Sequence, residues 1–185
     1  MPGNVIILTG PPGAGKSTIA RRIASLRASG VHLHTDDYWS AIIAGGIPAY
    51  LPEADEQNQT VLRAIAAAAF EFAYGGFDVV VDGIVGPWML HHFAEARRVH
   101  PSVDVSYTVL RPDRAVTLSR AIARTSPDAL IDPDPVLAMW DQFAHLGALE
   151  RHVLETSDED ADTTVVRVTQ VLAAGEHLLS HSPAG

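Results

Sequence analysis

Short apolar runs alternate along this chain with longer amphipathic stretches, which is typical of a parallel sheet whose strands are joined by crossover helices. Five apolar runs predict strands, at residues 4–9, 31–35, 77–81, 103–110 and 152–156. Apolar residues spaced by about 3.6 positions predict helices between them, at residues 16–28, 54–74, 87–99, 112–124, 136–146 and 161–172. Residues 36–53 predict a short helix followed by a loop. These elements predict a three-layer α/β/α sandwich around a five-stranded parallel sheet.

The length of 185 residues fits one domain with a single sizeable core, and we expect residues 1–175 to form it. Residues 120–135 are expected to act as a lid, because three prolines and three aspartates between Thr125 and Pro135 predict a mobile surface loop. Residues 176–185 are expected to form a frayed tail.

Charge and composition narrow the expected partners. The formal net charge is -9, and because nucleic-acid-binding proteins usually carry a positive surface, we expect no nucleic acid. The chain has no cysteine, which excludes a disulfide scaffold and is compatible with the cytoplasm, where we expect the protein. The first apolar run, Val5 to Leu8, has no basic flank and is too short for a membrane helix, so no membrane partner is expected. The oligomeric state stays open.

The segment Gly10–Ser17 matches the phosphate-binding pattern G-x-x-x-x-G-K-[ST] and lies between a predicted strand and a predicted helix. The glycines let backbone N–H groups turn toward phosphate oxygens, and the N-terminus of the following helix favours anions. A chance match is the alternative, but Lys16, the only lysine of the chain, falls in the lysine position of the pattern. We expect a nucleotide, ATP, to contact Gly10, Pro11, Pro12, Gly13, Ala14, Gly15, Lys16, Ser17 and Thr18.

Magnesium bound with a nucleotide needs protein oxygen atoms, and two side chains are candidates. The Ser17 hydroxyl belongs to the phosphate-binding segment, and Asp82 follows the apolar run 77–81. A strand-end aspartate is often only a turn or helix cap, which is the alternative for Asp82. Asp78 begins the same strand and is expected at the opposite edge of the sheet.

Asp36 and Asp37 follow the second predicted strand, at the edge of an α/β sheet where ligands bind. One of these carboxylates could orient and deprotonate an attacking hydroxyl, and we favour Asp36 as this catalytic base. The alternative is that one of them only caps the helix expected to start near Tyr38.

Arg120 and Arg124 are four residues apart, so they are expected to share one helix face beside the predicted lid. Arginine side chains suit phosphate oxygens, and we expect both to act in catalysis, with Arg120 also contacting the nucleotide. Arg111 and Arg114 are further candidates. The alternative for each of these arginines is an ordinary solvated surface position.

The segment expected to bind an acceptor is poor in cations, because Arg63 is the only lysine or arginine between Arg27 and Arg97. A phosphorylated acceptor would need such cations, since a buried phosphate without partners is costly. The segment instead suits a neutral polyhydroxy compound or an amine. Besides Asp36, the candidate acceptor contacts are Asp37, Trp39, Gln57 and Trp88.

In their order along the chain, these features resemble the small P-loop kinases, a group that includes adenylate, shikimate and gluconate kinases and chloramphenicol phosphotransferase. The resemblance rests on Gly10–Ser17, Asp36, Val81-Asp82-Gly83 and Arg120-x-x-x-Arg124. It implies binding of ATP and Mg²⁺, with Asp36 as the base. Two positions depart from the group: His34 replaces the first aspartate of the Asp-Ser-Asp segment of shikimate kinases, and residues 84–88 lack the arginine of adenylate kinases.

We therefore expect an ATP-dependent phosphotransferase that acts on a hydroxyl of a small, non-phosphorylated molecule, either sugar-like, aminoglycoside-like or another natural product. A nucleoside monophosphate kinase is one alternative. A nucleotide-binding ATPase or regulator without an acceptor, or a binding module without catalysis, are the others.

Overall fold

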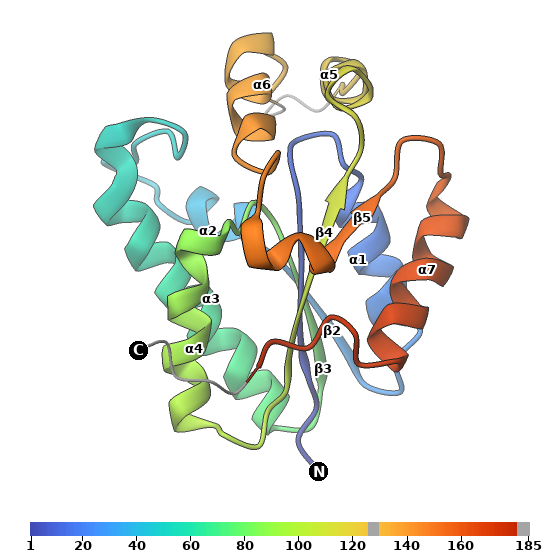
Figure 1. Ribbon diagram of the computed structural model, residues 1–185. Helices are drawn as coiled ribbons and strands as arrows, with labels where there is room; N and C mark the ends of the chain where they lie inside the picture. Colours follow the sequence, from blue (N-terminus) through green and yellow to red (C-terminus); the bar gives the residue numbers. More distant parts are fainter. Residues whose placement is uncertain (126–129, 181–185) are drawn as a thin grey trace.

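The computed structural model describes residues 1–125 and 130–180, and a five-stranded sheet forms its centre (Figure 1). The strands are β1 (Val5–Thr9), β2 (Gly30–His34), β3 (Asp78–Asp82), β4 (Val105–Arg111) and β5 (Val153–Glu155). Their order is β2-β3-β1-β4-β5, and all four neighbouring pairs are parallel. The prediction of a five-stranded parallel sheet is confirmed.

Helices cover both faces of this sheet (Figure 1). One face carries α1 (Lys16–Ser25) and α7 (Ala161–Ala173), and the other carries α3 (Asp55–Tyr74) and α4 (Leu90–Val99). Because successive side chains of a strand point to opposite faces, Val80 joins the apolar cluster under α1, while Val79 and Val81 join the cluster under α3. The predicted three-layer sandwich is also confirmed.

Shorter elements connect these layers. They are the helices α2 (Thr35–Ser40), α5 (Arg114–Ile122) and α6 (Pro133–Asp141), and the short 3-10 helices η1 (Pro52–Ala54), η2 (Pro87–Met89) and η3 (Gly147–His152). In Figure 1, α5 and α6 lie above the carboxyl ends of the strands. This edge of the sheet is where the phosphate-binding segment begins.

The predicted loop from Thr125 to Pro135 is shorter at its C-terminal end than expected. Pro133 opens α6, since proline suits the first turn of a helix, and the Asp132 side chain caps that helix by accepting from the backbone N–H of Asp134 over 3.2 Å. Residues 126–129 of the predicted lid lie outside the described residues.

Residues 176–180 lie against β4, whereas the sequence predicts a frayed tail there. The backbone N–H of Tyr107 donates to the carbonyl oxygen of His177 over 2.9 Å, and that of Leu179 donates to Val105 over 2.9 Å. The His177 side chain is 2% exposed, and its Nδ1 lies 2.9 Å from the Thr108 hydroxyl. The prediction was wrong here because β5 pairs only with residues 109–111 of β4, which leaves the earlier part of that strand to the tail. Residues 181–185 lie outside the described residues.

No helix within residues 1–125 and 130–180 combines the length and the apolar character that crossing a bilayer would require.

Candidate active site

The phosphate-binding segment joins β1 to α1 as a tight loop. Gly13 and Gly15 have φ angles of 83° and 84°, a region that favours glycine. Helix α5 packs directly on the loop, because a Cβ added to Gly13 would lie 2.6 Å from the carbonyl oxygen of Thr117. The shape of the loop therefore depends both on its own glycines and on the position of α5.

Lys16 is buried at the start of α1, and its Nζ donates a hydrogen bond to the carbonyl oxygen of Pro11 over 2.9 Å. Burial lowers the pKa of Lys16 to about 8, and the charge of Arg124 acts in the same direction, whereas those of Asp82 and Asp36 oppose it. An anion beside this ammonium group would offset the cost of its burial. The lysine is thus poised for a phosphate group on the loop.

Ser17 and Asp82, the two predicted magnesium ligands, lie side by side. The Ser17 hydroxyl donates to Oδ2 of Asp82 over 2.6 Å, and the Asp82 side chain is fully buried. Burial alone would raise the pKa of Asp82, but hydrogen bonds with His32, His34 and Ser17 hold it well below its usual range. Two converging oxygen atoms beside a phosphate loop, one of them anionic, fit Mg²⁺ bound together with nucleotide phosphates.

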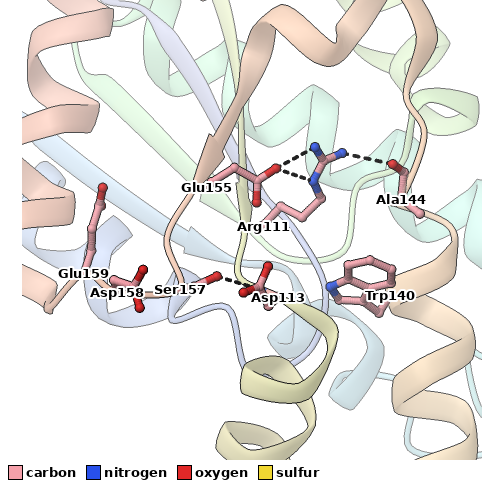
Figure 2. Close-up of a pocket in the computed structure, with 8 residues that line it drawn as sticks. All are labelled: Arg111, Asp113, Trp140, Ala144, Glu155, Ser157, Asp158 and Glu159. Carbon is pink, nitrogen blue, oxygen red and sulfur yellow. Dashed lines mark hydrogen bonds and ion pairs between the residues drawn. The ribbon is translucent and has the colours of Figure 1, made fainter.

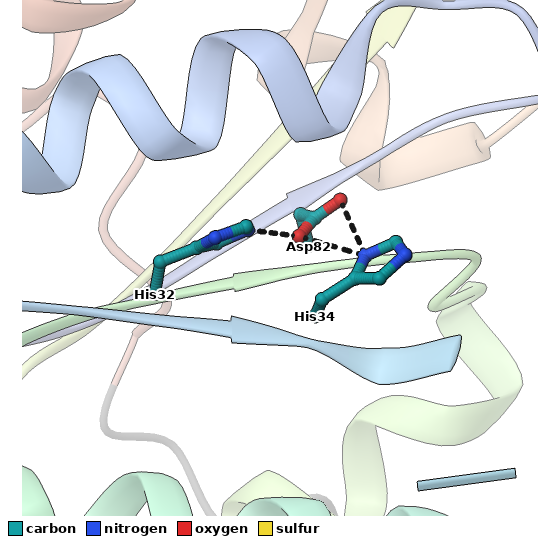
Figure 3. A group of neighbouring side chains, drawn as sticks. All are labelled: His32, His34 and Asp82. Atoms are coloured by element: carbon teal, nitrogen blue, oxygen red, sulfur yellow. Dashed lines mark hydrogen bonds and ion pairs between the residues drawn. The ribbon is translucent and has the colours of Figure 1, made fainter. Parts of the chain in front are cut away.

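Two histidines of β2 contact Asp82, and neither was predicted as a site residue. His32 Nε2 forms a short contact with Oδ1 of Asp82, and His34 Nδ1 lies 3.2 Å from both carboxylate oxygens (Figure 3). A signal was present in the sequence, because residues two apart in a strand face the same side. Their partner could not be identified that way, since the parallel register of β2 and β3 joins His34 to a residue 48 positions away.

Asp36 and Asp37 lie in the first turn of α2. The helix begins at Thr35 with His34 as its N-cap, so the alternative that one of the aspartates caps it was wrong. The Asp36 side chain is exposed, and its Oδ2 lies 3.6 Å from Nε2 of His34. Because the other nitrogen of that ring contacts Asp82, His34 links the exposed carboxylate to the buried one.

Arg120 and Arg124 do not share a helix face as expected, because α5 ends at Ile122 and Arg124 lies beyond it. The Arg120 guanidinium donates to the backbone carbonyl of Ser157 over 3.2 Å, on the connection between β5 and α7. Arg124 is close enough to Lys16 for its charge to lower the pKa of the lysine. The two arginines therefore have different surroundings: Arg120 is bound to the β5–α7 connection, whereas the charge of Arg124 acts on Lys16.

Arg111 lines a pocket of about 530 Å³ at the carboxyl ends of β4 and β5 (Figure 2). Its guanidinium donates to Glu150 and Glu155 and to the backbone carbonyl of Ala144. Most of the remaining polar lining is acidic, namely Asp113, Asp158 and Glu159. The guanidinium of Arg111, a further candidate for phosphate binding, is thus engaged by Glu150, Glu155 and a backbone carbonyl. Arg114 also has an acidic partner, Asp141.

Two amide side chains at the start of α3 hold the segment that connects it to α2. Both polar atoms of the Gln57 amide bond to the backbone of Ile47, at 2.7 and 2.9 Å. Asn58 donates to the carbonyl oxygen of Ala49 and accepts from Trp39 Nε1, both over 2.8 Å. Gln57, a predicted acceptor contact, is therefore engaged in ordering this segment, and Asn58, which was not predicted, fixes the orientation of Trp39.

Trp88, another predicted acceptor contact, lies 45% exposed on the turn after β3. The turn is held from the core, where the Thr9 hydroxyl accepts from the backbone N–H of Val85 and the Tyr107 hydroxyl donates to its carbonyl oxygen, both over 2.9 Å. The rigid base of this turn places an exposed aromatic ring near the same edge of the sheet as Asp82.

A parallel sheet with a glycine-rich phosphate loop, a buried lysine and a Ser–Asp oxygen pair defines a P-loop nucleotide-binding α/β protein. The family model described as an AAA domain, AAA_18, matches residues 6–141. The chain belongs to this family. No curated protein matches the sequence at a significant level.

Several solved structures with the same fold are kinases of small molecules. An unliganded sugar kinase from Janibacter sp. HTCC2649 is 23% identical with a TM-score of 0.69, covering 93% of this chain and 95% of that one. Shikimate kinase from Acinetobacter baumannii in complex with shikimate is 18% identical with a TM-score of 0.65, covering 94% of each chain. The Mycobacterium tuberculosis APS kinase in complex with AMPPNP and APS is 20% identical with a TM-score of 0.63, covering 93% of this chain and 98% of that one.

Proposed function

We propose that this chain is an ATP-dependent kinase that transfers the γ-phosphoryl group to a hydroxyl of a small, non-phosphorylated molecule. The observation that carries the proposal is the convergence at one sheet edge of a buried lysine, a Ser–Asp oxygen pair and an exposed carboxylate. These groups are Lys16, the pair Ser17–Asp82, and Asp36, which is joined to Asp82 through His34. The names of the similar structures, sugar kinase, shikimate kinase and APS kinase, support phosphoryl transfer as the reaction.

On the nucleotide side, the backbone N–H groups of Gly10–Thr18 and the Lys16 ammonium would bind the phosphates. Ser17 and Asp82 would hold Mg²⁺. When bound, this ion would neutralise part of the charge of the phosphates. Arg124, which already acts on Lys16 electrostatically, would stabilise the charge of the transferring group. Arg120, which donates to the Ser157 carbonyl on the β5–α7 connection, would contact the nucleotide from that side.

On the acceptor side, Asp36 would accept the proton of the attacking hydroxyl at a carboxylate oxygen. It is the better candidate of the two aspartates because its charge raises the pKa of Lys16, whereas that of Asp37 acts on Tyr38 and His34. His34 lies 3.6 Å from Asp36 and would orient it. The base and the phosphate-binding lysine would then lie on either side of the transferred group.

The class of acceptor follows from the charges around this edge. Arg63 is the only lysine or arginine between Arg27 and Arg97, and it lies exposed within α3. A phosphate-bearing acceptor would lack a cationic partner there, while exposed carboxylates favour hydroxyl and amine groups. The half-buried Trp39 and the exposed Trp88 offer apolar surface beside them. A sugar-like, aminoglycoside-like or other natural-product hydroxyl is therefore the proposed acceptor.

The test is a phosphoryl-transfer screen with labelled ATP over sugars, aminoglycosides, phenicols, nucleosides and nucleoside monophosphates. The variant Asp36→Asn is compared with Asp37→Asn, a matched change at the neighbouring position. We expect transfer to a non-phosphorylated acceptor that falls roughly 10²- to 10⁴-fold in Asp36→Asn, with ATP affinity kept, and only a few-fold in Asp37→Asn.

Two results would count against the proposal in different ways. AMP, CMP or UMP among the best acceptors would replace it with a nucleoside monophosphate kinase. Steady ATP hydrolysis whose rate does not change with any added acceptor or with Asp36→Asn would indicate an ATPase or regulator instead of a kinase.

A further inference from the structure

Two imidazole rings and one carboxylate meet on the α1 face of the sheet. His32 and His34 are two residues apart in β2, so their side chains share a face, and the register pairs His34 with Asp82 of β3. Figure 3 shows the two rings lying on either side of the Asp82 carboxylate, below α1. Three groups from two neighbouring strands thus point at one small volume.

The distances within this cluster suit a bound metal ion. One ligand atom from each of the three residues can be chosen so that all lie within 4.8 Å of one another. Tetrahedral ligands at about 2.0–2.2 Å from a metal are roughly 3.3–3.6 Å apart, and His34 Nδ1 lies 3.2 Å from both oxygens of Asp82. Small side-chain rotations would bring the three ligand atoms to that spacing.

The electrostatic surroundings favour a cation between these groups. The Asp82 carboxylate is fully buried, and the side chains of His32 and His34 are only 16% and 32% exposed. The Asp82 carboxylate lies 3.2 Å from Nδ1 of His34 and the Asp36 carboxylate lies 3.6 Å from its Nε2, so two acidic groups attract positive charge to this ring. A metal ion bound to the neutral imidazoles would interact favourably with the same carboxylates.

The ligand types indicate which metal fits. Mg²⁺ prefers oxygen ligands alone, as the Ser17–Asp82 pair provides. Two imidazole nitrogens with one carboxylate, and a remaining position open, are instead the ligand set of Zn²⁺ and other first-row transition ions.

We propose that His32, His34 and Asp82 form a binding site for a nitrogen-preferring divalent ion such as Zn²⁺. The site adjoins the proposed magnesium position and shares Asp82 with it. It rests on the geometry of the two strands and does not depend on the identity of the acceptor. Because Asp82 also accepts from Ser17, occupation of this site is coupled to the phosphate loop.

The test is calorimetric titration of the full chain with Zn²⁺ alone, in the absence of nucleotide. We expect one ion per chain, with affinity reduced by roughly 10- to 100-fold or more in His32→Ala and in His34→Ala. The matched control is His145→Ala, which removes an exposed histidine from another part of the chain and is expected to bind as the wild type does. Affinity unchanged in both β2 variants, or lost only in His145→Ala, would overturn the proposal.

A second measurement keeps the proposal testable if the β2 variants fold poorly. Co²⁺ added to the wild-type chain should develop visible absorption more intense than that of the hydrated ion, as nitrogen ligation in a low-symmetry site produces, and Zn²⁺ should abolish it. A spectrum that stays that of the hydrated ion would refute the site.

Discussion

Alanine substitutions at Gly13 and Gly15 would separate two reasons why the phosphate loop has its shape. Both residues have positive φ, at 83° and 84°, so both variants carry the same backbone strain. They differ in their surroundings. A Cβ at Gly15 meets no atom within 4 Å, whereas a Cβ at Gly13 would lie 2.6 Å from the carbonyl oxygen of Thr117 and 3.0 Å from the backbone nitrogen of Ala121.

The structure sets the expected size of each effect. Left-handed backbone costs alanine roughly 1–2 kcal/mol, part of which is offset because alanine also restricts the unfolded chain. Gly15→Ala should therefore lower the free energy of unfolding by about 1 kcal/mol. Gly13→Ala must also displace the backbone of α5, and overpacking of this kind costs roughly 1–3 kcal/mol more. Only the second change requires a helix to move.

Urea unfolding of both variants and the wild type measures this difference directly, with the slope of the transition as a check on the unfolded state. By thermal unfolding, the extra cost should appear as about 2–4 °C per kcal/mol for a chain of this size. Equal losses of stability in the two variants would refute the reasoning, since α5 would then not restrict the loop at Gly13.

Three further predictions test other contacts. Asn58→Leu leaves the Trp39 indole N–H without its partner and should lower the free energy of unfolding by roughly 1–3 kcal/mol, measured by urea unfolding; an unchanged midpoint would contradict that contact. Lys16→Ala should weaken ATP binding roughly 10- to 100-fold, measured by calorimetry. Its unfolding midpoint without nucleotide should be unchanged or higher, because burial of the Lys16 ammonium is unfavourable without phosphate, and a lower midpoint would contradict this reasoning. Burial lowers the pKa of His177 to about 4, so the folded state resists protonation, and the free energy of unfolding should fall as pH decreases from about 6.5 toward 4. His177→Asn, which keeps a polar partner for Thr108, should reduce this pH dependence. A pH profile of stability identical to that of the wild type would contradict the role of His177.

The main chemistry of the site could be predicted from the sequence because it depends on local patterns. The phosphate loop is a continuous segment, and its glycines and Lys16 have their roles wherever the segment folds between a strand and a helix. Asp82 could be predicted as the partner of Ser17 because carboxyl ends of parallel strands meet at one edge, and the 2.6 Å contact agrees with that expectation.

Other features depended on how elements end and what lies beside them. Four-residue spacing suggested that Arg120 and Arg124 share one helix face, but α5 ends at Ile122, so Arg124 is not part of the helix that carries Arg120. Gln57 looked free to contact a ligand, yet its amide bonds to Ile47 in a segment without regular structure. Patterns of apolar residues do not encode such contacts, because the contacts are made with backbone groups of loops.

Apolar periodicity in the sequence determined the layers of this protein, and the motif Gly10–Ser17 determined the location of its phosphate loop and the sheet edge at which its chemistry gathers. Only the tertiary structure decided that His32 and His34 meet Asp82 and that the tail around His177 completes β4. The physical reason is that periodicity states which face of an element is apolar, whereas strand order and register decide which distant side chains share that face.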